Sequence, residues 1–120
     1  MYKRSKSDVE KKTGDGLISQ ILLQKSDVDD SNLLVTWVEI QPGSKQKLHQ
    51  HVSEQVYVII KGSGEMTVGD EKENVTEGDI IYVPSNKLHG ILNTGNSLLA
   101  YVSAATPSFD VRIFYDENKP

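Results

Sequence analysis

The stretch Gln55-Val56-Tyr57-Val58-Ile59-Ile60 is rich in β-branched and aromatic residues, which fit the pleated surface of a β-strand. The turn residues Gly62-Ser63-Gly64 follow it, and the next run, Glu65–Val68, has the same strand character. Because successive side chains of a strand point to opposite faces, Tyr57 should share the inner face with Gln55. The stretch therefore predicts two strands joined by a glycine turn.

The same alternation of short apolar runs and turn clusters extends along the chain from Gly16 onward. The further runs are Leu17–Leu23, Leu33–Ile40, Asp79–Val83, Gly90–Asn93, Leu98–Ser103 and Val111–Tyr115. Helical periodicity is nearly absent, because only Ser7–Lys12 is compatible with a helix. About eight short strands must close or double up to bury their apolar faces and hide their edges. We therefore predict an all-β chain folded as a sandwich or a jelly-roll β-barrel.

The length of 120 residues fits one domain with one hydrophobic core. We expect residues 1–15 to form an N-terminal tail or a short helix, and residues 16–120 to form the β-barrel domain. The sequence contains no cysteine, so disulfides, thiolate metal sites and cysteine nucleophiles are excluded. A bound metal would therefore need histidine, carboxylate or amide ligands.

The charge pattern narrows the classes of partner. The formal net charge is −4, and nucleic-acid binding needs clustered Lys and Arg, so we expect no nucleic-acid partner. The basic residues of segment 1–12 are interrupted by Asp8 and Glu10, which is typical of a solvated tail. No sustained apolar run follows this segment, so the sequence predicts neither a signal peptide nor a membrane span. A cytoplasmic protein is the expectation.

The chain holds three histidines, and all of them lie beside strands or turns. His49 and His51 are two residues apart, so in an extended backbone both imidazoles point to one face and can converge on one ion. His89 follows a predicted strand and the turn Pro84-Ser85-Asn86. Since nothing else in the chain offers a nucleophile with a base beside it, these histidines are the candidate chemistry.

These segments resemble the paired motifs of the cupin superfamily, whose members are small β-barrels with jelly-roll topology. The first motif has a glycine, a His-x-His pair, an acidic residue and a second glycine, and here these positions hold Gly43, His49, His51, Gln55 and Gly62. The second motif is present with every spacing kept, as Gly78, Pro84, Asn86, His89 and Asn93. The resemblance covers about residues 33–102, and it implies one divalent metal ion held by His49, His51, Gln55 and His89.

Two positions depart from the family pattern. Asn86 replaces a glycine, and asparagine is the residue besides glycine that most readily adopts a positive φ, so the turn should survive. Gln55 replaces the acidic ligand and brings an oxygen donor without a charge. Glu54 is its rival, but strand alternation points Glu54 to the other face unless a bulge swings it in. Some barrels that resemble this one, including enzymes acting on unsaturated sugar acids, also carry His-x-His with Gln and a later His.

A ligand set of three histidines and a glutamine accommodates Fe, Mn, Ni, Co or Zn, because imidazole binds all of these ions. A neutral ligand set leaves the ion a strong Lewis acid, which suits a small oxygenated, anionic molecule. We therefore expect a metal-dependent cupin of the sugar-acid or keto-acid isomerase or lyase type, or a dioxygenase. The alternative is a non-catalytic module that binds a small molecule or a metal.

Three further expectations concern the surroundings of the site. Tyr57 is the candidate catalytic hydroxyl for proton transfer, with a core tyrosine whose hydroxyl is satisfied as the alternative. The segment Ser103–Asp110 should flank the pocket opening, anchored by Phe109. The basic N-terminal segment and the exposed edges of a small barrel favour a homodimer, because pairing covers an edge strand.

Overall fold

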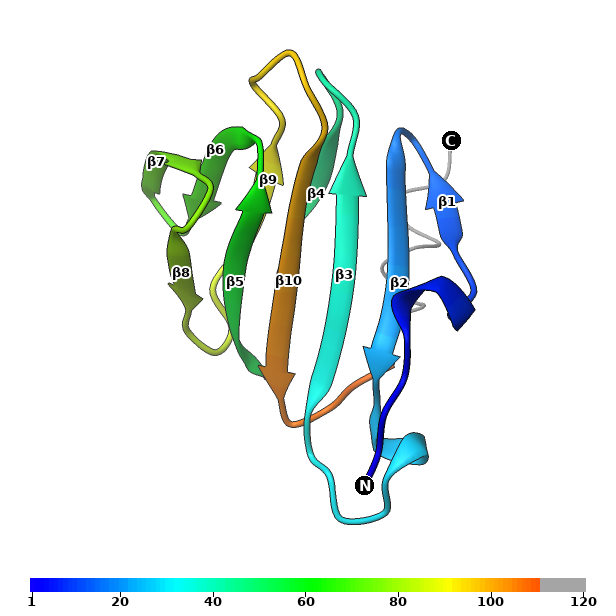
Figure 1. The fold of residues 1–120 in the computed structure, drawn as a ribbon. Helices are drawn as coiled ribbons and strands as arrows, with labels where there is room; N and C mark the ends of the chain where they lie inside the picture. Colours follow the sequence, from blue (N-terminus) through cyan, green and yellow to red (C-terminus); the bar gives the residue numbers. More distant parts are fainter. Residues whose placement is uncertain (111–120) are drawn as a thin grey trace.

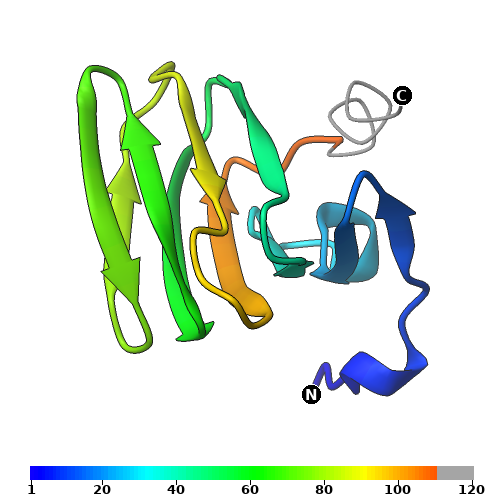
Figure 2. The ribbon, with the colours of Figure 1, turned by 90° about the horizontal axis from the view of Figure 1, so that it is seen from above.

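Two antiparallel β-sheets pack face to face in the structure, a computed structural model that describes residues 1–110 (Figures 1 and 2). The larger sheet contains, in spatial order, β1 (Lys12–Gly14), β2 (Leu17–Leu23), β3 (Leu34–Ile40), β10 (Leu99–Thr106), β5 (Glu54–Lys61) and β8 (Ile80–Val83). The smaller sheet contains β4 (Lys45–His49), β9 (His89–Leu92), β6 (Ser63–Val68) and β7 (Glu71–Thr76). Two short 3-10 turns, Lys6–Asp8 and Lys25–Asp27, complete the described elements. The predicted strand Val111–Tyr115 lies outside the described residues.

The all-β, jelly-roll prediction is confirmed, with one difference in closure. Within residues 1–110 the two sheets are not joined into a continuous hydrogen-bonded barrel, because β8 and β7 each end their sheet as an edge strand. The arrangement is therefore a two-layer sandwich with the core between the layers.

Burial along the strands follows the predicted period of two. β3 alternates between buried and half-buried positions along its whole length, and in β5 the side chains of Gln55, Tyr57 and Ile59 are buried while Val56 and Val58 are only half-buried. Register with β10 is unbroken from Glu54 to Ile59, and register with β8 is unbroken from Gln55 to Val58, so no bulge alters the alternation there. The faces assigned from the sequence are therefore those of the structure.

Three strands lack an apolar run and were missed by the sequence pattern. In β7 only Val75 is buried, because this edge strand carries charged side chains on a solvent-exposed ladder. β4 is similarly polar, although it pairs with β9 next to the histidines. β1 pairs with β2 from Lys12, within the segment for which we predicted a tail or a short helix. Backbone pairing, rather than side-chain polarity, defines these strands.

The core draws on both sheets. Its largest fully buried side chains include Tyr57, Tyr101, Ile40 and Leu99 from the larger sheet and Ile91 from the smaller one. The rings of Tyr57 and Tyr101 are stacked, with centroids 4.6 Å apart. The histidines border one end of this apolar layer, since the Tyr57 ring lies edge-on to that of His89.

The N-terminal segment runs along the outer face of the larger sheet rather than into solvent (Figure 1). The Gln20 amide donates hydrogen bonds to the carbonyls of Lys6 and Val9, and the Lys6 ammonium lies 4.7 Å from the centroid of the Trp37 ring. These contacts cover the β2 and β3 side of that face. Within the described part of the chain, no helix is long and apolar enough to cross a membrane.

Candidate metal centre

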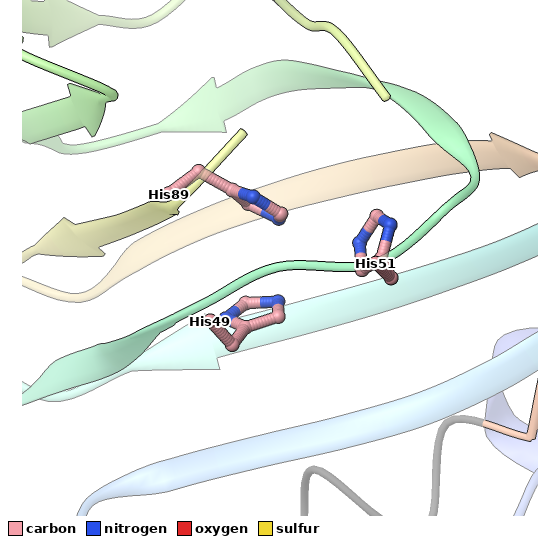
Figure 3. A group of neighbouring side chains, drawn as sticks. All are labelled: His49, His51 and His89. Atoms are coloured by element: carbon pink, nitrogen blue, oxygen red, sulfur yellow. The ribbon is translucent and has the colours of Figure 1, made fainter. Parts of the chain in front are cut away.

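The three histidines come from two segments of the chain, residues 49–51 and His89, and meet between the sheets (Figure 3). His49 ends β4 and His89 begins the neighbouring strand β9, where the two residues are directly paired. His51 lies in the loop that follows β4, and its carbonyl accepts a hydrogen bond of 2.8 Å from the backbone N–H of Asn86. This bond joins the first motif to the turn that precedes His89, so both motifs are held at one place.

The geometry of the cluster is compact. One ring nitrogen of each histidine lies within 4.8 Å of those of the other two. Nitrogens that ligate one ion at about 2.1 Å are at most about 4.2 Å apart, and about 3.4 Å apart at a tetrahedral angle, so metal binding requires the most distant rings to approach by at least about half an ångström. His89 is fully buried, whereas His49 and His51 are half-buried. The cluster is therefore accessible to solvent from the side of the first motif.

The same hydrogen-bonding arrangement fixes all three rings. The Nδ1 atoms of His49, His51 and His89 lie 2.8 Å from the carbonyl oxygens of Lys47, Ser53 and Lys87 respectively. A carbonyl only accepts, so each Nδ1 must carry the proton and donate it. In the neutral rings the lone pair is then on Nε2, which is the tautomer that a metal ion needs.

Electrostatics keep His89 neutral. Burial, followed by the nearby His49, lowers the pKa of His89 to about 4 against the opposing effect of the Lys87 carbonyl. Its Nε2 atom is buried and has no hydrogen-bond partner. A buried acceptor without a partner costs about 1–3 kcal/mol, and a metal ion at this position would satisfy it. The donor set therefore fits a divalent transition metal.

Gln55 and Glu54 point in opposite directions. The Gln55 Oε1 atom lies 3.1 Å from Nε2 of His51, and the Gln55 side chain is buried. In this arrangement two acceptor atoms face each other, which is favourable only if a proton or a cation lies between them. Glu54 is exposed and accepts a hydrogen bond from the hydroxyl of Tyr82 on the outer face. The cluster found among residues 1–110 thus contains no carboxylate.

Two hydroxyl residues behind Gln55 were missed in the sequence. The Gln55 amide nitrogen donates to Oγ of Ser103 over 3.1 Å, and the Ser103 hydroxyl lies 2.7 Å from that of Thr36. Both hydroxyl residues are buried on the inner face of the larger sheet. This network directs the amide oxygen toward the histidines. The sequence signal that could have revealed them is a hydroxyl residue at an inward-facing position of an otherwise apolar strand.

Tyr57 and Phe109 both lie next to the cluster but contact it differently. The Tyr57 hydroxyl donates a 2.6 Å hydrogen bond to Oε1 of Gln46, and burial raises its pKa far above the usual value. A hydroxyl of this kind can donate a hydrogen bond but is a poor base. Phe109 places its ring 4.6 Å from that of His51, centroid to centroid, so the segment after β10 does pass the cluster.

Motif residues outside the histidine cluster have structural roles. Asn86 adopts a φ of 61°, as predicted for the position where the family has glycine. Gly62 has a φ of 83°, and a Cβ there would lie 2.5 Å from the carbonyl oxygen of Leu98, so only glycine fits. The Asn93 amide donates to the carbonyls of Ile40 and Ser97, which ties the end of β9 to β3 and to the following loop.

Comparison with known proteins agrees with the fold and the motif spacing. The family model for the cupin domain matches residues 36–104. An uncharacterized protein of Methanocaldococcus jannaschii is 36% identical over 98 residues, which cover 81% of this chain and 78% of that protein. The oxalate-binding protein of Thermotoga maritima is 30% identical over 83 residues, covering 68% of this chain and 69% of that protein.

Solved structures show the same fold. The crystal structure of a predicted oxalate decarboxylase from Thermotoga maritima superimposes with a TM-score of 0.78 at 22% identity. The match covers 86% of this chain and 96% of that chain. The family model matches more than half of the residues of this chain, so the chain belongs to the cupin family.

Proposed function

We propose that this cupin binds one divalent transition metal ion through His49, His51, His89 and Gln55. The observation that carries the proposal is the shared orientation of the three imidazoles, each with Nδ1 bound to a backbone carbonyl, so that the lone pair of each neutral ring lies on Nε2. The buried Nε2 of His89, which lacks a hydrogen-bond partner, adds to it. Gln55 supplies the fourth donor because its amide oxygen faces the same space.

The bound molecule is a small oxygenated anion, such as a dicarboxylate, a sugar acid or a keto acid. With four neutral protein ligands, the ion keeps its full positive charge and supplies Lewis acidity to carboxylate or carbonyl oxygens. The names found in Thermotoga maritima support a carboxylate ligand, since the curated relative is named for oxalate binding and the solved structure is titled a predicted oxalate decarboxylase. The identity of the ion among Fe, Mn, Ni, Co and Zn is open, because imidazole accepts all of them.

A Lewis-acidic ion of this kind would catalyse a reaction of the lyase or isomerase type, and a dioxygenase is the other catalytic candidate. The second candidate function is binding without turnover, which the name of the oxalate-binding relative favours. Among the residues of the site, Tyr57 acts in this proposal as a hydrogen-bond donor to Gln46, because its raised pKa keeps the hydroxyl protonated. A cytoplasmic location and a homodimer remain predictions from the sequence.

Elemental analysis of protein expressed with added metal tests the proposal. We expect about one equivalent of transition metal per chain in the wild type. Gln55→Ala should weaken the affinity by about tenfold, the loss of one neutral ligand bond, whereas Glu54→Ala should leave it unchanged. A wild-type protein that holds no metal would refute the site, and the opposite order of the two variants would make Glu54 the ligand.

Titration of the metal-loaded protein with oxalate then separates the two candidate functions. Calorimetry reports binding, and assays for carbon dioxide and formate report turnover. Binding without product favours the non-catalytic module, and product formation favours the lyase.

The hydroxyl network behind Gln55 gives a further prediction. Ser103→Ala removes the acceptor of the Gln55 amide nitrogen, so the amide oxygen should lose its fixed direction. We expect metal affinity, measured by competition with a chelator, to fall about tenfold, as is usual for residues that orient metal ligands. Thr36→Val, which keeps the shape of the side chain, should have a smaller effect because it contacts Ser103 and not Gln55. Unchanged affinity in Ser103→Ala, with reduced affinity in Gln55→Ala, would show that Ser103 does not orient the ligand.

A further inference from the structure

The outer face of the smaller sheet has a groove of about 390 Å³, which we name the outer groove. Its lining residues come from all four strands of that sheet, β4, β9, β6 and β7. Neighbouring residues of a strand point to opposite faces, so His89 is directed to the metal centre and Gly90 to the outer groove. The groove is therefore separate from the metal centre, and its volume is in the range of small-molecule sites.

Strand register arranges the outward side chains of the groove in two rows across the sheet. The first row holds, on successive strands, Lys45, Leu92 and Glu65. The second row holds Gly90, Thr67 and Lys72. Since β4 and β7 are the edge strands of this sheet, Lys45 and Lys72 lie at opposite ends of the groove. Three strand spacings separate their backbones by about 14 Å.

The floor of the groove is apolar because Gly90 has no side chain. A Cβ at Gly90 would lie 3.2 Å from Cδ2 of Leu48, so the absence of a side chain lets Leu48 lie close against β9. Leu48 comes from the part of β4 where the register with β9 shifts, and it is 53% exposed. Together with Leu92 it offers apolar surface between the two charged ends.

The charges around the groove favour an anionic ligand. Lys45, Lys47 and Lys72 line it together with one carboxylate, that of Glu65, although the whole chain has a net charge of −4. Within residues 1–110, neither Lys45 nor Lys72 forms an ion pair. Positive side chains gathered in a concave site on an acidic protein raise the local concentration of anions there.

We propose that the outer groove binds a small organic dianion with an apolar body, which lies across β9 between the lysines of β4 and Lys72 of β7. One anionic group binds Lys45, and the other binds Lys72 and accepts a hydrogen bond from the hydroxyl of Thr67. Because lysine side chains are long and flexible, they can reach a dianion shorter than the spacing of the strands. Glu65 repels an anionic group from the middle of the first row, which directs the second group to Thr67 and Lys72.

Titration with suberate, an eight-carbon dicarboxylate, tests the site in the full-length, zinc-loaded protein. Nuclear magnetic resonance of isotope-labelled protein should show saturable shifts at the backbone amides of Thr67, Lys72 and Gly90. Octanoate lacks the second charge and oxalate lacks the apolar body, so each should bind the groove at least about tenfold more weakly. Shifts confined to the metal centre, or no saturable shift up to about 10 mM suberate, would overturn the proposal.

Charge variants test the assigned contacts by the sign of their effect. Lys72→Gln should weaken suberate binding at least about threefold, and Glu65→Gln should strengthen it by a similar factor, because one removes an attraction and the other a repulsion. Lys61→Gln is the matched control, since Lys61 is exposed at the end of β5 in the other sheet and its loss changes the net charge equally. An equal loss of affinity in Lys61→Gln and Lys72→Gln would show that net charge, and not the groove, attracts the anion.

Discussion

Replacement of His89 by alanine is expected to abolish stoichiometric metal binding, with a loss of affinity of at least about a hundredfold. His89 is fully buried, and its Nε2 is the only ring nitrogen of the cluster in the described chain that is buried without a hydrogen-bond partner. Its pKa of about 4 keeps it neutral at pH 7, so no proton competes with the metal there. Without it, the ion would keep only the two half-buried histidines and Gln55.

His89→Leu provides the control for this experiment. Leucine fills a similar volume and has no donor atom, so it should also remove the metal. In the metal-free state we expect its free energy of unfolding to be within about 2 kcal/mol of the wild type, because the unsatisfied Nε2 is removed together with the bond to Lys87. A folded His89→Leu protein that still binds one equivalent of metal would show that the ion is held elsewhere.

The second large effect concerns stability. Tyr57→Ala should lower the free energy of unfolding by about 3–5 kcal/mol, as for other large aromatic side chains in cores. Tyr57 is completely buried and stacked on Tyr101, so its loss leaves a cavity between the sheets. For a domain of this size the expected fall in Tm is at least about 10 °C, measurable by circular dichroism. A fall of less than a few degrees would contradict the assigned place of Tyr57 in the core.

Tyr57→Phe separates packing from the hydroxyl. The ring stays and the hydrogen bond to Gln46 is lost, so the expected cost in stability is about 1 kcal/mol. Metal content should be unchanged. If Tyr57 does transfer a proton, this variant will lose turnover while keeping metal and stability, which distinguishes a catalytic hydroxyl from a structural one.

Strand faces and motif spacing were predictable because they are local properties. An alternating strand such as β5 has a fixed relation between sequence and face, which placed Gln55 and Tyr57 inward. The turn at Asn86 was predictable for the same reason, since few residues tolerate its positive φ. The strands β4 and β7 were not, because their partners, and not their own side chains, make them strands.

The sequence by itself determined that the chain is an all-β cupin and which histidines its two motifs contain, because spacing and alternation act within a few residues. Only the tertiary structure decided how the site is assembled. The bond from Asn86 to His51, the carbonyls that fix each imidazole and the hydroxyls of Ser103 and Thr36 behind Gln55 join distant segments. Such contacts depend on how strands pair across the fold, and strand pairing is not encoded at any single position of the chain.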